Sequence, residues 1–305
     1  MDSSAASLTA ATAGVDASIA GVVAAGAVSQ GQTFVLTTGV DGGAAFTGTA
    51  KNDIFNAALV NSVNSLNSLD SLTGGAGSDT LNVELASSVT PAGIAGIEII
   101  NTTFSAGGLA LNLVNAPDVT TVTSRSSANS GTVSNIAAGA SVGITDQAVG
   151  ATFAYKTTEG TQTVGLALNN VTSNAAITIS GIETINVTSG TSANSMALAA
   201  DSVTTLNVSG SANLTLSNVA SGSASLTKLD ASALTGSLDM GAAGPAGLVT
   251  INGGSGNDSL YGTSSVNNNL NAGAGNDTIV MAGNLTSADT INGGNGTDVL
   301  SMTAG

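Results

Sequence analysis

The chain has 305 residues, a formal net charge of −15 and charged side chains at only 8% of its positions. Four Lys and Arg residues give no basic patch for phosphate groups, which excludes nucleic-acid binding and disfavours an anionic membrane surface. Because the chain has no His and no Cys, His-based catalytic triads, Cys nucleophiles and zinc sites of the usual ligands are also excluded.

The composition also limits how a core can be built. Aromatic residues make up 2% of the chain, so the aromatic packing used by most globular cores is not available. Hydrophobic residues nevertheless reach 42%, in short β-branched runs such as Thr33–Thr37 and Ile177–Ile179. This pattern favours stacked short strands over disorder, and it predicts an all-β fold: a right-handed parallel β-solenoid or β-roll with very little helix. No run of about 18 apolar residues occurs, so no membrane insertion is predicted.

In chain order, the sequence divides into four predicted segments. They are a flexible Ala/Ser-rich segment at 1–32, a strand with glycine-rich turns at 33–84, a β-solenoid without such turns at 85–250, and a second group of glycine-rich turns at 251–305. The strand-like stretch Gln32–Thr38 is expected to complete the sheet edge of a neighbouring subunit. Asn residues recur between the strands and predict stacked Asn ladders, for example at Asn101, Asn186, Asn207 and Asn252.

The first group of turns contains a nonapeptide of the form G-G-x-G-x-D-x-U-x, in which U is a large apolar residue. A full copy lies at Gly74–Asn82 and a weaker one at Gly48–Asn56. Two nonapeptides make one coil of about 18 residues in a parallel β-roll. Asp70 precedes Asp79 by nine residues and follows Asp53 by 17, one residue short of a full coil.

The second group of turns is more regular. Full copies lie at Gly253–Tyr261 and Gly293–Ser301, with a near copy at Ala272–Val280. Their Asp residues are separated by 19 and then 21 positions, close to one coil, which predicts that Asp258, Asp277 and Asp298 line one edge. Asn268 and Asp289 each precede a member of that row by nine residues, and they are predicted to lie on the opposite edge.

The residue types of the motif point to a divalent cation. Gly permits positive φ and exposes backbone carbonyls, Asp adds a carboxylate, and the apolar residue anchors a short strand. Ca²⁺ prefers six to eight oxygen ligands, more than one turn supplies, so several Ca²⁺ ions are predicted between stacked turns. The predicted ligand positions are Asp53, Asp70, Gly74, Gly75, Gly77, Asp79, Gly253, Gly254, Gly256, Asp258, Asn268, Gly273, Gly275, Asp277, Asp289, Gly293, Gly294, Gly296 and Asp298.

These nonapeptides resemble those of RTX proteins, which are calcium-dependent bacterial proteins exported by type I secretion. A second repeat class narrows the resemblance. Its segments are Gly96–Asn101 and Gly181–Asn186, both G-I-E-x-I-N, then Asp118–Val122, Asp201–Leu206 and Lys228–Gly236. Over residues 33–305 this series resembles the lattice-forming β-solenoid region of proteobacterial RTX S-layer proteins.

The resemblance implies a secreted structural protein that folds and self-assembles on calcium binding, into an S-layer-like lattice or a biofilm matrix filament. Its predicted partner is itself, with cell-surface polysaccharide or lipopolysaccharide as a further candidate. The alternative is a calcium-dependent bacterial adhesin or ligand-binding repeat module. A polysaccharide-active β-helix enzyme is a remote alternative, because two Tyr and five Phe provide few platforms for sugar rings, and no enzyme activity is predicted.

Overall fold

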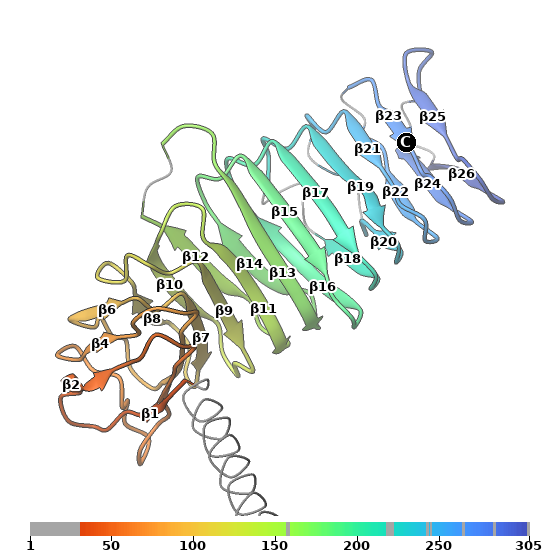
Figure 1. Ribbon diagram of the computed structural model, residues 1–305. Coiled ribbons are helices and arrows are strands. Elements are labelled where there is room, and N and C mark those ends of the chain that lie inside the picture. Colours follow the sequence, from red (N-terminus) through yellow and green to blue (C-terminus); the bar gives the residue numbers. More distant parts are fainter. Residues whose placement is uncertain are drawn as a thin grey trace, which may run out of the picture.

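The computed structural model describes residues 31–156, 159–217, 223–241, 244, 246–263, 266–282 and 285–303. These residues form an all-β parallel solenoid, as predicted, in which each coil places one strand in each of two facing sheets (Figure 1). No helix occurs among them. The predicted flexible segment 1–32 falls almost entirely outside the described residues, and the predicted divisions near residues 84 and 250 stay predictions.

Three parallel sheets make up the solenoid. The 13-stranded sheet contains β1 (Thr33–Val35), β3 (Ile54–Ala57), β5 (Thr80–Leu85), β7 (Ile99–Phe104), β9 (Thr121–Arg125), β11 (Ser141–Gln147), β13 (Thr163–Val171), β15 (Thr184–Ser189), β17 (Thr205–Gly210), β19 (Lys228–Leu234), β21 (Thr250–Asn252), β23 (Asn269–Asn271) and β25 (Thr290–Asn292). The ten-stranded sheet contains β8 (Leu109–Asn112), β10 (Gly131–Ile136), β12 (Ala151–Tyr155), β14 (Ala175–Ile179), β16 (Asn194–Ala199), β18 (Leu214–Ser217), β20 (Leu238–Asp239), β22 (Ser259–Tyr261), β24 (Thr278–Ala282) and β26 (Val299–Thr303). A three-stranded sheet at the N-terminal end contains β2 (Gly42–Thr47), β4 (Ser71–Thr73) and β6 (Gly93–Ala95).

The core is built from the inward side chains of alternate strand positions. In β5 these are Leu81, Val83 and Leu85, and the parallel register places Leu81 beside Phe55 and Ile100 of the adjacent coils. Each such side chain contributes about 1.5–3 kcal/mol by leaving water, so stability accumulates coil by coil from small residues. This is how a chain with few aromatic residues buries one continuous core.

The first coil at the N-terminal end is richer in aromatic residues than the rest. Phe34 of β1 stacks on Phe55 of β3 with ring centroids 4.5 Å apart, and Phe46 of β2 lies 6.2 Å from Phe34. The stretch Gln32–Thr38, predicted to complete the sheet edge of a neighbouring subunit, contains β1, which pairs with β3 of the same chain on one side. β1 is an edge strand of its sheet, so pairing of its other side with a neighbouring subunit stays a prediction.

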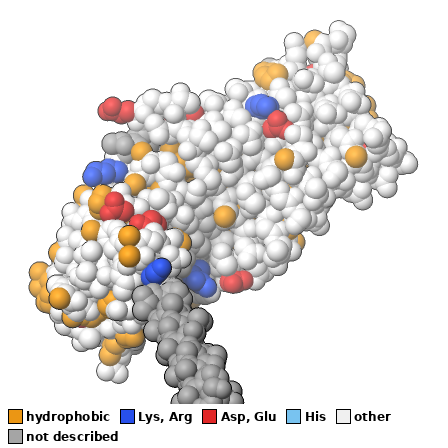
Figure 2. Space-filling view, viewed as in Figure 1, with side chains coloured by type: hydrophobic (Ala, Val, Ile, Leu, Met, Phe, Trp, Pro, Cys, Tyr) orange, Lys and Arg blue, Asp and Glu red, His pale blue; other side chains and the backbone are white. Residues whose placement is uncertain are grey.

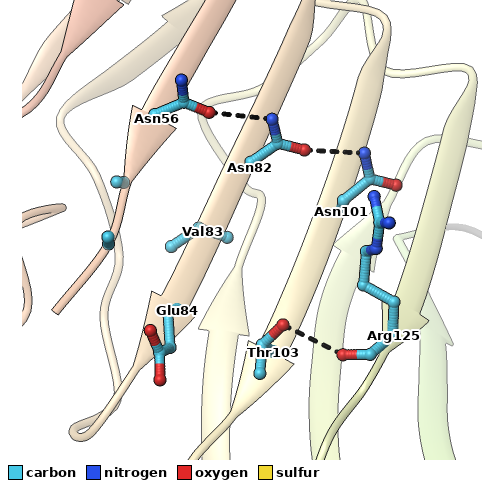
Figure 3. A pocket seen from close by; sticks show the side chains of 9 residues that line it. Asn56, Asn82, Val83, Glu84, Asn101, Thr103 and Arg125 are labelled. Atoms are coloured by element: carbon cyan, nitrogen blue, oxygen red, sulfur yellow. Dashed lines mark hydrogen bonds between the residues drawn. The ribbon is translucent and has the colours of Figure 1, made fainter. Parts of the chain in front are cut away.

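The predicted Asn ladders are present at Asn101, Asn186 and Asn207, which lie within strands and face outward. Asn252 makes no hydrogen bond to another Asn side chain among the described residues. Asn82 donates a hydrogen bond to Asn56 Oδ1 over 2.9 Å, and Asn101 donates to Asn82 Oδ1 over 2.9 Å (Figure 3). Asn207 donates likewise to Asn186. Parallel in-register strands place identical side chains side by side, which allows each amide to donate to the preceding coil and accept from the following one.

We expect the change Asn82→Ala to lower the free energy of unfolding by about 1–2 kcal/mol, because it removes two hydrogen bonds at partly exposed positions. The midpoint of urea denaturation, followed by circular dichroism, measures the loss. Glu84→Ala is the matched control, since Glu84 lies on the same face of β5 and has no hydrogen bond with a described residue (Figure 3). Equal losses in the two variants would contradict a stabilising role for the ladder.

Candidate calcium-binding turns

The predicted C-terminal row is a ladder of hydrogen-bonded carboxylates with one Asp in each coil. Asp258, Asp277 and Asp298 stand immediately before β22, β24 and β26. The Asp258 N–H donates to Asp277 Oδ1 over 2.8 Å, and the Asp277 N–H donates to Asp298 Oδ1 over 3.1 Å. At the other end of the row, Leu238 N–H donates to Asp258 Oδ1 over 2.7 Å. Each carboxylate therefore holds the turn of the preceding coil.

The opposite edge carries the shorter predicted row. Asn268 and Asp289 stand immediately before β23 and β25 of the 13-stranded sheet. The Asn268 N–H donates to Asp289 Oδ1 over 2.6 Å, which repeats the pattern of the longer row. The bond from Asn268, together with one from the Thr286 N–H, holds the pKa of Asp289 below its ordinary value. The nine-residue spacing thus places these two side chains across the coil from the Asp258–Asp298 row.

The N-terminal turns contain a third row with a member that the motif does not include. Asp53 and Asp79 stand before β3 and β5, and the Asp53 N–H donates to Asp79 Oδ1 over 2.6 Å. The Asp79 N–H in turn donates to Glu98 Oε2 over 2.8 Å. Glu98 belongs to a G-I-E repeat rather than to a nonapeptide. The signal that could have found it is its spacing of 19 residues from Asp79.

Asp70 does not lie in that row, and its 17-residue spacing from Asp53 does not correspond to a coil. Asp70 stands before β4 in the three-stranded sheet and accepts a bond from the Asp41 N–H over 2.8 Å. The coil that starts at Asp53 ends 26 residues later at Asp79, because it includes a turn closed by an antiparallel bridge between Val60 and Val63. Asp41 was not among the predicted ligand positions because it does not lie in a nonapeptide.

The glycines of the motif lie where a side chain would block oxygen atoms. A Cβ atom added at Gly74 would overlap both the Asp79 carboxylate and the Gly96 carbonyl oxygen of the next coil. The first glycines of the other full copies, Gly253 and Gly293, have the same relation to Asp258 and Asp298. The remaining motif glycines lie directly on backbone of the preceding coil: Gly75, Gly77, Gly254, Gly256, Gly273, Gly275, Gly294 and Gly296. All of these except Gly254 and Gly256 also have positive φ.

Two carboxylate oxygens in these rows are buried without a protein partner. Asp79 Oδ2 and Asp277 Oδ2 make no hydrogen bond, although their residues are 0% and 1% exposed. Burial raises the pKa of both carboxyls above the ordinary value, and the neighbouring carboxylates of Asp53 or Asp298 raise it further. A buried acceptor with no donor carries a free-energy cost that a bound cation would remove. These two atoms indicate that the turns fit a cation.

The ligand set available to such a cation consists of oxygen atoms from both side chains and backbone. No cluster of three or more His, Cys, Asp or Glu side chains suited to a metal occurs in the part of the chain that the structure describes. One carboxylate per coil must therefore be supplemented by carbonyl oxygens, and the glycines leave those of adjacent coils uncovered. A set of carboxylate and carbonyl oxygens is the one that Ca²⁺ prefers.

Comparison with known proteins agrees with this chemistry. The family model of the RTX calcium-binding nonapeptide repeat (four copies) matches residues 67–85, 263–280 and 285–305. The copies at Gly48–Asn56 and Gly253–Tyr261 lie outside those ranges. No curated protein matches the chain. Among the described residues, no helix has the length and apolar character needed to cross a membrane.

RTX nonapeptide repeats bind calcium and are typical of secreted proteins, which fits an extracellular location. The repeats and the parallel solenoid together support an RTX-type repeat protein with a calcium-binding β-roll.

Proposed function

We propose that the protein is a secreted structural protein that folds when it binds calcium and then assembles with itself outside the cell, as an S-layer-like lattice or a matrix filament. The observation that carries this proposal is the position of the calcium-type turns. They occupy both ends of the solenoid, around Asp53–Asp79 and Asp258–Asp298, where contacts between subunits would form. Type I secretion, which the repeats suggest, would deliver the chain to the extracellular medium, where calcium folds its end coils.

The proposal is tested by electron microscopy and sedimentation of the purified protein in calcium at the order of 10⁻³ M, the range of extracellular calcium modules, and in EGTA. We expect an ordered assembly with calcium and dispersed chains after chelation, with magnesium as the control cation. Ordered assemblies that survive complete chelation would contradict calcium control. Folded but dispersed chains in calcium would contradict self-assembly.

A second candidate function, a ligand-binding module of an adhesin, is favoured by one groove on the outer face of the 13-stranded sheet. The groove has a volume of about 360 Å³, and its lining includes Asn82, Asn101, Glu84 and Arg125 (Figure 3). Its amide, carboxylate and guanidinium groups suit the hydroxyls and acidic groups of a cell-surface polysaccharide or lipopolysaccharide. Binding of such a glycan to dispersed monomers, lost in Arg125→Ala, would favour this function over self-assembly.

A further inference from the structure

We propose that the C-terminal face of the solenoid, formed by β25 and β26, docks onto the N-terminal face of a second copy, formed by β1 and β2. This inference rests on the proposed self-assembly and specifies its contact. In Figure 1 the two faces lie at opposite ends of one rod, so the contact would continue the rod from one copy into the next.

The C-terminal face exposes residues that the preceding coil keeps buried. Leu300 is 48% exposed and Met302 is 51% exposed, whereas their register partners in β24, Ile279 and Met281, are 2% and 1% exposed. The exposure differs because β26 covers β24, while no described strand covers β26. In the described part of the chain, β26 therefore presents the apolar surface that a further strand would cover.

Exposed apolar side chains are concentrated at the two ends of the rod. In the described part of the chain, Val114 and Val249 are the only large apolar residues exposed between the end coils. The N-terminal end carries Val35, Val40, Ile54, Val60, Val63 and Leu69, and the C-terminal end carries Leu285, Val299, Leu300 and Met302. Figure 2 shows the N-terminal group as a gathering of apolar atoms over the end that contains β2, next to a side face with few of them. Such a distribution is typical of contact surfaces.

The chemistry of the two faces is complementary. The N-terminal face contains the half-buried rings of Phe34 and Phe46, and the C-terminal face contains Leu300 and the thioether of Met302. Contacts between a methionine sulfur and an aromatic ring contribute about 0.3–1.5 kcal/mol beyond apolar burial.

The sheet edges also correspond. β1 and β25 are the two edge strands of the 13-stranded sheet, while β2 and β26 are edge strands of the sheets that face it. Each end coil runs in the same order along the chain, β1 before β2 and β25 before β26. Pairing β25 with β1 and β26 with β2 of the next copy would satisfy both unpaired edges in a parallel arrangement.

The carboxylate ladder supplies an independent match. Within the chain, each Asp N–H donates to the Asp of the next coil, from Asp277 to Asp298 and from Asp41 to Asp70. The Asp298 N–H has no acceptor among the described residues, and Asp41 Oδ1 accepts only the Thr37 hydroxyl, over 2.9 Å. A bond from Asp298 to Asp41 of the next copy would continue the same pattern. It would also stack the Gly293–Asp298 turn on the 36–41 turn.

A contact between two different faces is heterologous, and because these faces lie at opposite ends of one rod (Figure 1), repeating it extends the rod into an open filament rather than closing a ring. The net charge of −15 on each copy opposes the contact, which makes calcium binding at the end turns a condition for it. Docking of this kind therefore produces a fibre, or a lattice built from fibres.

Disulfide trapping tests the contact directly, because the chain contains no Cys. Stacking β25 on β1 in the register of the chain's own coils aligns Asp289 with Gln32 of the next copy and places Thr290 beside Thr33, both of which are exposed. Adjacent parallel strands lie about 4.8 Å apart, within the Cα separation of a disulfide. We expect Thr290→Cys mixed with Thr33→Cys to form a covalent dimer in calcium, and neither variant to do so alone. Val114→Cys, on the side of the rod, is the control and should stay monomeric with either partner.

A disulfide between two Thr290→Cys chains would show tail-to-tail contact and overturn the proposal. Leu300→Lys provides a second measurement. We expect this variant to keep its calcium-dependent circular dichroism and to lose assembly in sedimentation, whereas Val114→Lys keeps both. If the wild type assembles and Leu300→Lys assembles equally well, the docking contact is wrong while the proposed function stands. If the wild type stays monomeric and folded in calcium, self-assembly itself fails.

Discussion

Removing calcium is expected to unfold the two ends of the solenoid while its central coils stay folded. The end coils depend on turns in which Asp79 and Asp277 bury a carboxylate oxygen without a protein donor. A bound ion would stabilise each turn by about 2.7 kcal/mol at a free calcium concentration about 100 times its dissociation constant. Since the coils of a solenoid contact only their neighbours, loss of the end coils need not unfold the centre.

The central coils have another means of holding their turns. The Gly96 N–H donates to Asp118 Oδ2 over 2.7 Å, and the Gly181 N–H donates to Asp201 Oδ1 over 3.0 Å. These bonds are exposed to solvent, so the carboxylates keep their hydration and no cation is required to offset burial. In the 13-stranded sheet the central strands are also longer than those of the C-terminal end, with seven residues in β11 and nine in β13 against three in β23 and β25.

Hydrogen exchange followed by mass spectrometry, with calcium and with EGTA, measures this difference along the chain. We expect amides of β21–β26 and β3–β5 to lose protection on chelation, and amides of β9–β17 to keep it. Magnesium in place of calcium is the control, because it accepts irregular sets of carbonyl ligands poorly. Uniform loss of protection from end to end would show instead that calcium controls the fold as one unit.

A pair of substitutions at Asp277 is expected to separate the hydrogen-bonding role of the ladder from its cation-binding role. Asp277→Asn keeps an oxygen to accept the Asp258 N–H but removes the charge. Burial raises the pKa of Asp277, so the ionised form is costly in the calcium-free fold, and a neutral side chain avoids that cost. We therefore expect Asp277→Asn to be at least as stable as the wild type in EGTA, and to gain much less stability from calcium.

Asp277→Ala is expected to be less stable than the wild type under both conditions. It leaves the buried Asp258 N–H without an acceptor, which costs about 1–3 kcal/mol, and it removes a cation ligand as well. Urea denaturation of the wild type and both variants, with and without calcium, gives the change in unfolding free energy of each variant under each condition. Asp201→Asn is the matched control, because Asp201 caps a turn outside the nonapeptides and should leave the calcium response unchanged. A full calcium response in Asp277→Asn would contradict a cation-binding role for this residue.

The regular part of the site could be predicted from the sequence because the repeats there are regular. The Asp258–Asp298 row and its opposite edge followed from spacings of 19, 21 and nine residues, which differ little from those of ideal coils. The fold class followed from short β-branched runs in a chain with few aromatic residues. Both depend on local pattern, and a parallel solenoid converts local period directly into position.

Other features could be identified only from the tertiary structure. A coil of 26 residues moved Asp70 out of the Asp53–Asp79 row and paired it with Asp41, because an extra turn lengthens the path without changing the stacking of strands. Glu98 lies in the Asp53–Asp79 row because the strand register places it one coil after Asp79, and no sequence motif indicates that position. The exposure of Leu300 and Met302 could not be predicted either, since the equivalent apolar residues of the preceding coil, Ile279 and Met281, are buried. The sequence by itself thus determined the repeat and its chemistry. Which oxygens share a row, and which apolar residues lack a covering coil, depended on how the coils stack, because both are set by contacts between residues far apart in the chain.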